Sequence, residues 1–184
     1  KRHVLTSRKT HSPIMVKPTS SQNQRPERVL VCTHNAHKLE EIAAMLSDFQ
    51  IAVVSPKEFP DLPEPEETGD TFEANALIKV DSAFSHTGLP CLADDSGLVV
   101  PILGGAPGIY SARYANHSGP DRDRANRQKL VTDLRSFTPE ERKAYFHCSL
   151  IIRTSAEHTH HFVGQCHGEI IDEERGEHGF GYDP

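Results

Sequence analysis

In Ala93-Asp94-Asp95-Ser96-Gly97-Leu98, two adjacent carboxylates and a hydroxyl stand between apolar runs. Cys91 to Ala93 precede the acids and Leu98 to Val100 follow them, so the pattern predicts a buried strand that breaks and turns at the acidic pair. Paired acids in such a place can hold a divalent cation or activate a water, and Gly97 would let the backbone reverse. A plain hairpin turn is the competing interpretation, because Asp, Ser and Gly are ordinary turn formers.

The composition limits the classes of protein to which the chain can belong. Its 184 residues suit one domain, or one domain with a small lobe. The net charge of -6 argues against a general nucleic-acid binder, although it allows binding of a single nucleotide. No apolar run approaches the roughly 20 residues that cross a bilayer. The four cysteines form no Cys-x-x-Cys pair, so we expect reduced thiols packed as small hydrophobes, which favours an intracellular setting.

The N-terminal end differs in composition from the rest of the chain. Lys1 to Pro26 hold six basic residues and no acidic one, so we expect a disordered basic leader over residues 1–27 and a folded domain over residues 28–184. The leader has the composition of an organellar transit peptide but lacks clear amphipathic periodicity. We therefore expect a cytoplasmic protein, with organellar targeting or a plain chain extension as alternatives.

A short apolar strand at Val29 to Cys32 is followed by a polar loop, Thr33 to Lys38, and then by helical spacing of apolar residues from Leu39 to Phe49. In α/β proteins this order often forms a phosphate site, with free backbone N–H groups and Lys38 directed at an anion above the helix N-terminus. The loop lacks the glycines of a P-loop. A simple connector with a surface lysine is the alternative.

The next stretch contains a second strand at residues 51–54, a Pro-rich exposed loop at residues 55–67 and a helix that begins near Asp70. Asp70 with Glu73 has the form of a capping box. Asn75 and Lys79 lie four residues apart, beside the apolar face of this helix. They predict either a polar site facing the helix or a solvated surface.

The second half predicts a glycine-rich loop at residues 104–108, a helix from Ser118 or Asp121 to about Arg135, and neighbouring strands at residues 144–152 and 159–171. Three histidines lie at the start of the second strand: His158, His160 and His161. They fit a solvated strand end better than a metal site, because no further ligands lie at a suitable spacing. The aromatic pair in Gly179 to Asp183 is typical of a base-stacking loop.

Five ordered blocks together resemble the inosine triphosphate pyrophosphatase (HAM1-like) family, which hydrolyses non-standard purine nucleoside triphosphates. The blocks are Thr33 to Lys38, Glu67 to Ala76, Ala93 to Leu98, Pro107 to Tyr114 and Gly179 to Pro184. The resemblance covers everything after the leader. It implies a two-lobed α/β fold with a long, twisted mixed sheet and a nucleotide cleft between the lobes.

The resemblance also implies the chemistry. Inosine, deoxyinosine and xanthosine triphosphates would be cleaved to the monophosphate and pyrophosphate with Mg²⁺, by a homodimer that binds no nucleic acid or membrane. Asp95 would be the catalytic base, and Glu67 with Asp95 would bind the metal. Asp94 would place a second charge beside Asp95 and favour metal capture. The implied substrate-binding residues are Thr33, His34, Asn35, Ala36, His37, Lys38, Ser96, Phe180, Gly181, Tyr182 and Asp183.

Family members continue after the last block with a lysine and a Ser-His-Arg element that read the purine 6-keto group. The sequence stops at Pro184, so we expect a C-terminally truncated member whose base specificity has no assigned residues. Two alternatives remain. One is a Maf-like pyrophosphatase for modified nucleotides, and the other is an inactive nucleotide-binding module.

Overall fold

The protein is described by a computed structural model that covers residues 25–33, 35–175 and 179–183. Most of the expected leader therefore lies outside the described residues. The described elements, with η for 3₁₀ helices, are β1 Arg28–Val31, α1 Ala36–Ser47, β2 Ala52–Val54, η1 Pro56–Glu58, α2 Phe72–Thr87, β3 Cys91–Val99, η2 Pro101–Leu103, η3 Gly108–Arg113, α3 Arg122–Asp133, η4 Pro139–Glu141, β4 Lys143–Arg153 and β5 Thr159–Glu169.

Within the described residues, five strands form one mixed sheet in the order β2-β1-β3-β4-β5. β1 is parallel to β2 and β3, whereas β3, β4 and β5 are antiparallel neighbours. β3 is at the centre and pairs with β4 along all nine of its residues, from Cys91↔Arg153 to Val99↔Tyr145. This confirms the α/β class and the mixed sheet.

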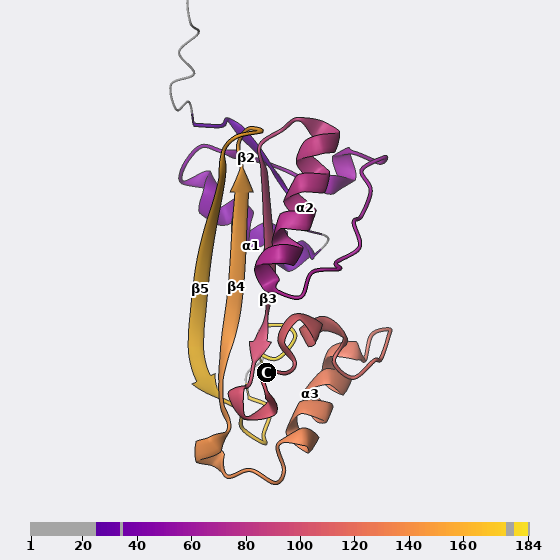
Figure 1. The fold of residues 1–184 in the computed structure, drawn as a ribbon, viewed down its shortest axis with the longest axis vertical. Coiled ribbons are helices and arrows are strands. Elements are labelled where there is room, and N and C mark those ends of the chain that lie inside the picture. Colours follow the sequence, from indigo (N-terminus) through magenta and orange to yellow (C-terminus); the bar gives the residue numbers. More distant parts are fainter. Residues whose placement is uncertain (1–24, 34, 176–178, 184) are drawn as a thin grey trace, which may run out of the picture.

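Helices cover both faces of the sheet at the end that holds β1 and β2 (Figure 1). On one face, Ala76, Val80 and Ala83 of α2 pack against Leu30 and Ile151. On the other face, Leu39 and Ile42 of α1 pack against β1 and β3. α3 lies at the opposite end of the molecule, where Leu130 and Leu134 close a separate core cluster. The division into two lobes stays a prediction.

The expected turn at the acidic pair is wrong. Asp94 to Gly97 continue β3 without a break, and the strand runs from Cys91 to Val99. Gly97 has a different reason to be glycine: a Cβ here would lie 2.5 Å from Ser111 Oγ and 2.6 Å from the Gly108 carbonyl oxygen. Close approach of η3 to β3 therefore excludes a side chain at this position.

The other sequence predictions differ in detail. The cap of α2 is Thr71, whose hydroxyl accepts from the Ala74 N–H, and not Asp70. Asp121 precedes α3 but makes no side-chain cap bond. The cysteines are free, and Cys166 is exposed, so it does not pack as a small hydrophobe. In the described part of the chain, no helix has the length and apolar character needed to span a membrane.

Candidate active site

The loop after β1 positions the start of α1 through Asn35. Its side chain accepts hydrogen bonds from the His37 N–H at 3.0 Å and the Lys38 N–H at 3.4 Å, as a typical N-cap does. The N–H groups of His37 and Lys38 are therefore engaged by this cap, and anion binding by the loop stays a prediction. The positive end of the helix dipole lies at the same place.

The acids of β3 point to opposite faces of the sheet, because successive residues of a strand alternate. Asp94 lies on the α1 face and is 7% exposed. Its Oδ2 accepts from Lys38 Nζ at 2.5 Å and from Ser96 Oγ at 2.8 Å. Asp94 and Asp95 therefore do not form one pair of metal ligands, which corrects the expectation that Asp94 adds to metal capture by its neighbour.

Asp95 lies on the α2 face and meets Glu67 through Lys79. Lys79 Nζ is 2.8 Å from Glu67 Oε1, 3.1 Å from Asp95 Oδ1 and 3.2 Å from the Asp94 carbonyl oxygen. Asn75, which is fully buried, donates from Nδ2 to Asp95 Oδ2 at 3.3 Å and accepts from the Gly69 N–H at 2.9 Å. The spacing of Asn75 and Lys79 thus marks a polar site and not a solvated surface.

Burial and charge act against each other in this cluster. Burial raises the pKa of the Asp95 carboxyl above its ordinary value, although the charge and hydrogen bond of Lys79 oppose it. Burial lowers the pKa of the Lys79 ammonium, but the hydrogen bond to Glu67 and the charges of Asp95 and Glu67 outweigh burial, so this pKa is raised. Lys79 is therefore cationic at neutral pH, and Asp95 is a stronger base than a solvated aspartate.

The cluster fits a divalent cation by the chemistry of its donors. Glu67 and Asp95 converge on one positively charged atom, Lys79 Nζ. Mg²⁺ prefers hard oxygen ligands and is commonly held by one or two carboxylates together with waters and phosphate oxygens. No group of three or more His, Cys, Asp or Glu side chains comes together among the described residues. Among the described residues, the cluster therefore offers the two carboxylates of Glu67 and Asp95.

Two cavities share Asn35, Ala112 and Arg122 in their walls, and Glu67 and Lys79 of the cluster line one of them. The larger, of about 550 Å³, contains Thr33, Glu67 and Lys79. The smaller, of about 250 Å³, contains Lys38, Ser96 and the segment Phe180 to Asp183. A cavity with polar and charged walls and a cavity with an aromatic segment therefore lie next to each other.

The Phe180 ring lines the smaller cavity. It stacks on His37 with ring centroids 6.1 Å apart and an angle of 10° between the planes. Residues from the first and last predicted blocks are therefore brought together, as the sequence predicts. His34 lies outside the described residues, and Ala36 is the first residue of α1. The roles proposed for these residues stay predictions.

Arg122 lines the cavities, although the sequence pattern gives no indication of a site at this residue. Arg122 at the start of α3 contributes to both cavities, yet its segment has the polar pattern of a solvated helix. Its Nε donates to Asp123 at 3.0 Å. Only the folded chain brings Arg122 into the same cavity walls as Asn35 of the loop after β1.

The fold and the site together define an α/β protein whose cleft combines carboxylates, lysines and an aromatic segment, which is suited to metal-assisted chemistry on a nucleotide. The sequence profile of the Ham1 family matches residues 29–184. The chain belongs to this family.

Two relatives and a solved structure are similar to this chain. The dITP/XTP pyrophosphatase of Geobacter sulfurreducens is 49% identical over 157 residues, which are 85% of this chain and 78% of the relative. The dITP/XTP pyrophosphatase of Vibrio cholerae is 44% identical over 160 residues, 86% and 78% of the two chains. A HAM1 protein from Coxiella burnetii has a TM-score of 0.77 at 39% identity, covering 85% of this chain and 79% of the other.

Proposed function

We propose that this chain hydrolyses non-standard purine nucleoside triphosphates, such as those of inosine, deoxyinosine and xanthosine, to the monophosphate and pyrophosphate. The observation that carries the proposal is the convergence of Glu67 and Asp95 on one cationic position beside the phosphate loop. The activity named for the relatives from Geobacter sulfurreducens and Vibrio cholerae supports it.

Mg²⁺ is the cofactor that fits the donor set, and Glu67 and Asp95 are the residues that would hold it. When bound, the metal would supply positive charge against the phosphates and lower the pKa of a water. Lys38 and the N-terminus of α1 would bind the triphosphate and neutralise part of its charge. Thr33, Asn35 and Ser96 complete the polar wall of this subsite.

Asp95 would hold the proton that the attacking water loses. Its raised pKa suits this role, because a stronger base accepts a proton more readily. Asn75 fixes Oδ2 of the same carboxylate. The stacked rings of His37 and Phe180, with Gly181, Tyr182 and Asp183, would receive the base.

The test is release of pyrophosphate from inosine triphosphate with Mg²⁺. We expect activity in the wild-type chain and a loss of about 10²–10⁴-fold in Asp95→Asn, the range for a general base. Asp61→Asn, at an exposed position of the Pro-rich loop, is the matched control and should retain activity. Thermal stabilisation by nucleotide without any turnover would overturn the proposal in favour of an inactive binding module.

Preference for keto-purines is a separate part of the proposal. Parallel assays with inosine and adenosine triphosphates should give a higher rate with inosine triphosphate, and equal rates would contradict the preference. A homodimer and a cytoplasmic location also stay predictions, which light scattering of the purified chain and cell fractionation would test.

A further inference from the structure

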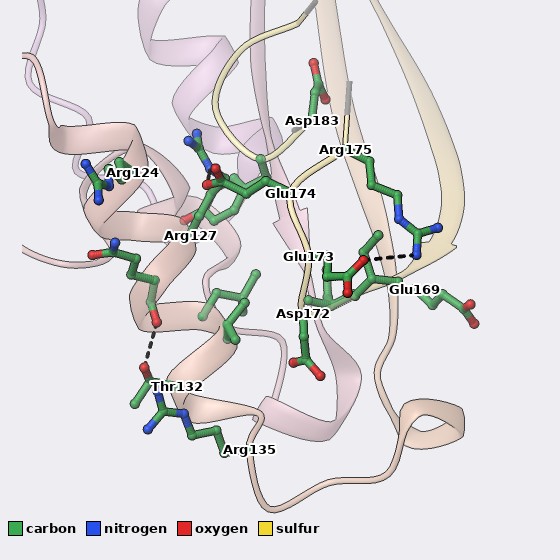
Figure 2. Close-up of a pocket in the computed structure, with 16 residues that line it drawn as sticks. Arg124, Arg127, Thr132, Arg135, Glu169, Asp172, Glu173, Glu174, Arg175 and Asp183 are labelled. Atoms are coloured by element: carbon green, nitrogen blue, oxygen red, sulfur yellow. Dashed lines mark hydrogen bonds and ion pairs between the residues drawn. The ribbon is translucent and has the colours of Figure 1, made fainter. Parts of the chain in front are cut away.

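Arg127 of α3 hydrogen-bonds to the aromatic segment 179–183, and Tyr182 of this segment also packs on the core cluster that contains Leu130. Arg127 Nη1 donates to the Gly181 carbonyl oxygen at 2.8 Å, and Nε of the same side chain donates to Glu174 Oε1 at 2.7 Å. Figure 2 shows Arg127 beside Glu174, whereas Arg124 lies nearer the N-terminus of α3 and away from Glu174. The guanidinium therefore connects the helix to two points of the chain after β5.

A second tether comes from η3 and is neutral. The Tyr182 hydroxyl donates to the Ser111 carbonyl oxygen at 2.9 Å. Within the segment, the Phe180 N–H donates to Asp183 Oδ2 at 3.2 Å, and the Asp183 N–H donates to the Phe180 carbonyl oxygen at 3.1 Å. The segment is thus a closed turn that is fastened to the protein at Gly181 and Tyr182, the two residues after Phe180.

The tether at Gly181 has the stronger chemistry. A guanidinium donates a charge-assisted hydrogen bond, and the Arg127 side chain is only 19% exposed. Glu174 is 59% exposed, so its ion pair with Arg127 contributes little stability and mainly orients the guanidinium. Gly181 has a φ of 62°, a left-handed conformation that a fixed carbonyl direction helps to maintain.

We propose that Arg127 is the positioning residue of the base-binding segment: by holding the Gly181 carbonyl, it fixes Phe180 against His37 and sets affinity for the base. This inference rests on the proposed role of residues 180–183 in binding the base. Arg127 contacts neither the acids of β3 nor the phosphate loop in the bonds described above. Its loss should therefore weaken binding of the base and spare the phosphate subsite.

The experiment compares Arg127→Met with Arg124→Met, an exposed position on the same helix without a hydrogen bond or ion pair to the described residues. Calorimetric titrations use two probes: inosine monophosphate, which carries the base, and inorganic tripolyphosphate, which does not. We expect Arg127→Met to lose about tenfold in affinity for inosine monophosphate, equal to about 1.4 kcal/mol. Tripolyphosphate affinity, and both affinities of Arg124→Met, should stay within twofold of wild type.

Kinetics and hydrogen exchange supply independent readouts. With inosine triphosphate, KM should rise about tenfold in Arg127→Met while kcat stays within about twofold, and Arg127→Lys should recover part of the loss. Amide exchange in residues 179–183 should be faster in Arg127→Met, even without nucleotide.

The outcomes distinguish failure of the base-binding role of residues 180–183 from failure of the positioning role of Arg127. If the wild-type chain binds tripolyphosphate but not inosine monophosphate, the role of residues 180–183 is wrong and the inference is overturned with it. If wild type binds both probes and Arg127→Met binds inosine monophosphate equally well, only the inference about Arg127 is overturned. Parallel loss of both affinities in Arg127→Met would show a general structural role and would also overturn it.

Discussion

Lys79→Met should destabilise the metal-free protein and make it respond more strongly to Mg²⁺. The ammonium lies between Glu67 and Asp95, at 2.8 and 3.1 Å, and the three side chains are 19%, 31% and 13% exposed. Methionine retains most of the aliphatic stem but leaves two carboxylates facing each other without a cation. Removing one partner of a fully buried ion pair costs about 3–5 kcal/mol, and partial exposure here reduces the expected loss to about 2 kcal/mol.

That loss corresponds to a fall in Tm of about 4–8 °C for a chain of this length. Thermal unfolding with a chelator present measures it at pH 8, with Lys143→Met as control. Lys143 forms a 2.7 Å ion pair with Glu169, but both side chains are more than half exposed, so this variant should change Tm by little.

Mg²⁺ and pH provide the further tests. Because Mg²⁺ would replace the lost cation, it should raise the Tm of Lys79→Met more than that of wild type. Asp95 already has a raised pKa, and loss of Lys79 raises it further. The stability that Lys79→Met loses should therefore be largest at a pH above the Asp95 pKa. The loss should shrink as the pH falls through that pKa, because protonation of Asp95 removes its repulsion with Glu67. An unchanged Tm, or equal stabilisation of both proteins by Mg²⁺, would refute the reasoning.

Three further variants test the packing around the site, with stability read from urea unfolding. Asn75→Leu should cost about 2–3 kcal/mol, because it removes the partner of the Gly69 N–H and of Asp95, and a cost near zero would contradict this role. Gly97→Ala should cost about 1–3 kcal/mol, because its Cβ would clash with η3, whereas Gly168→Ala has open space around it and should be tolerated. Similar losses in the two variants would contradict the close approach of η3 to β3. Leu134→Ala should cost about 2–5 kcal/mol, because Leu134 is fully buried, whereas Met45→Ala should cost almost nothing, because Met45 is 66% exposed. A larger loss in Met45→Ala would contradict this placement of the core.

Much of the fold follows from local pattern, because alternating apolar residues and helical spacing are properties of short segments. Strands β1, β4 and β5 and helices α1 and α2 lie where the sequence predicts them. The wrong prediction at Asp94 to Gly97 came from turn-forming residues. Nine pairs with β4 outweigh that local tendency, and such pairing cannot be read from the segment itself.

The candidate site was predictable where polar or charged side chains occur beside apolar ones. Asn75 and Lys79 beside an apolar helix face indicate a polar partner, and the structure supplies Glu67 and Asp95. Arg122 and Arg127 were not predictable, because they are two of the many charged residues of α3, and such a pattern resembles a solvated helix face. Their roles depend on tertiary contacts with segments far away in the sequence.

Because β3 continues without interruption through its acidic pair, insertions and deletions in β3 and β4 should be poorly tolerated. Since neighbouring residues of a strand face opposite sides, a shift of one residue in the pairing of β3 with β4 would move Asp94 to α2 and Asp95 to α1. The ion pairs Lys38–Asp94 and Lys79–Asp95 would then both be broken, because each acid would lie on the face of the other's lysine. Insertions or deletions of single residues in these two strands should therefore be far less tolerated than substitutions, even at positions remote from the acids.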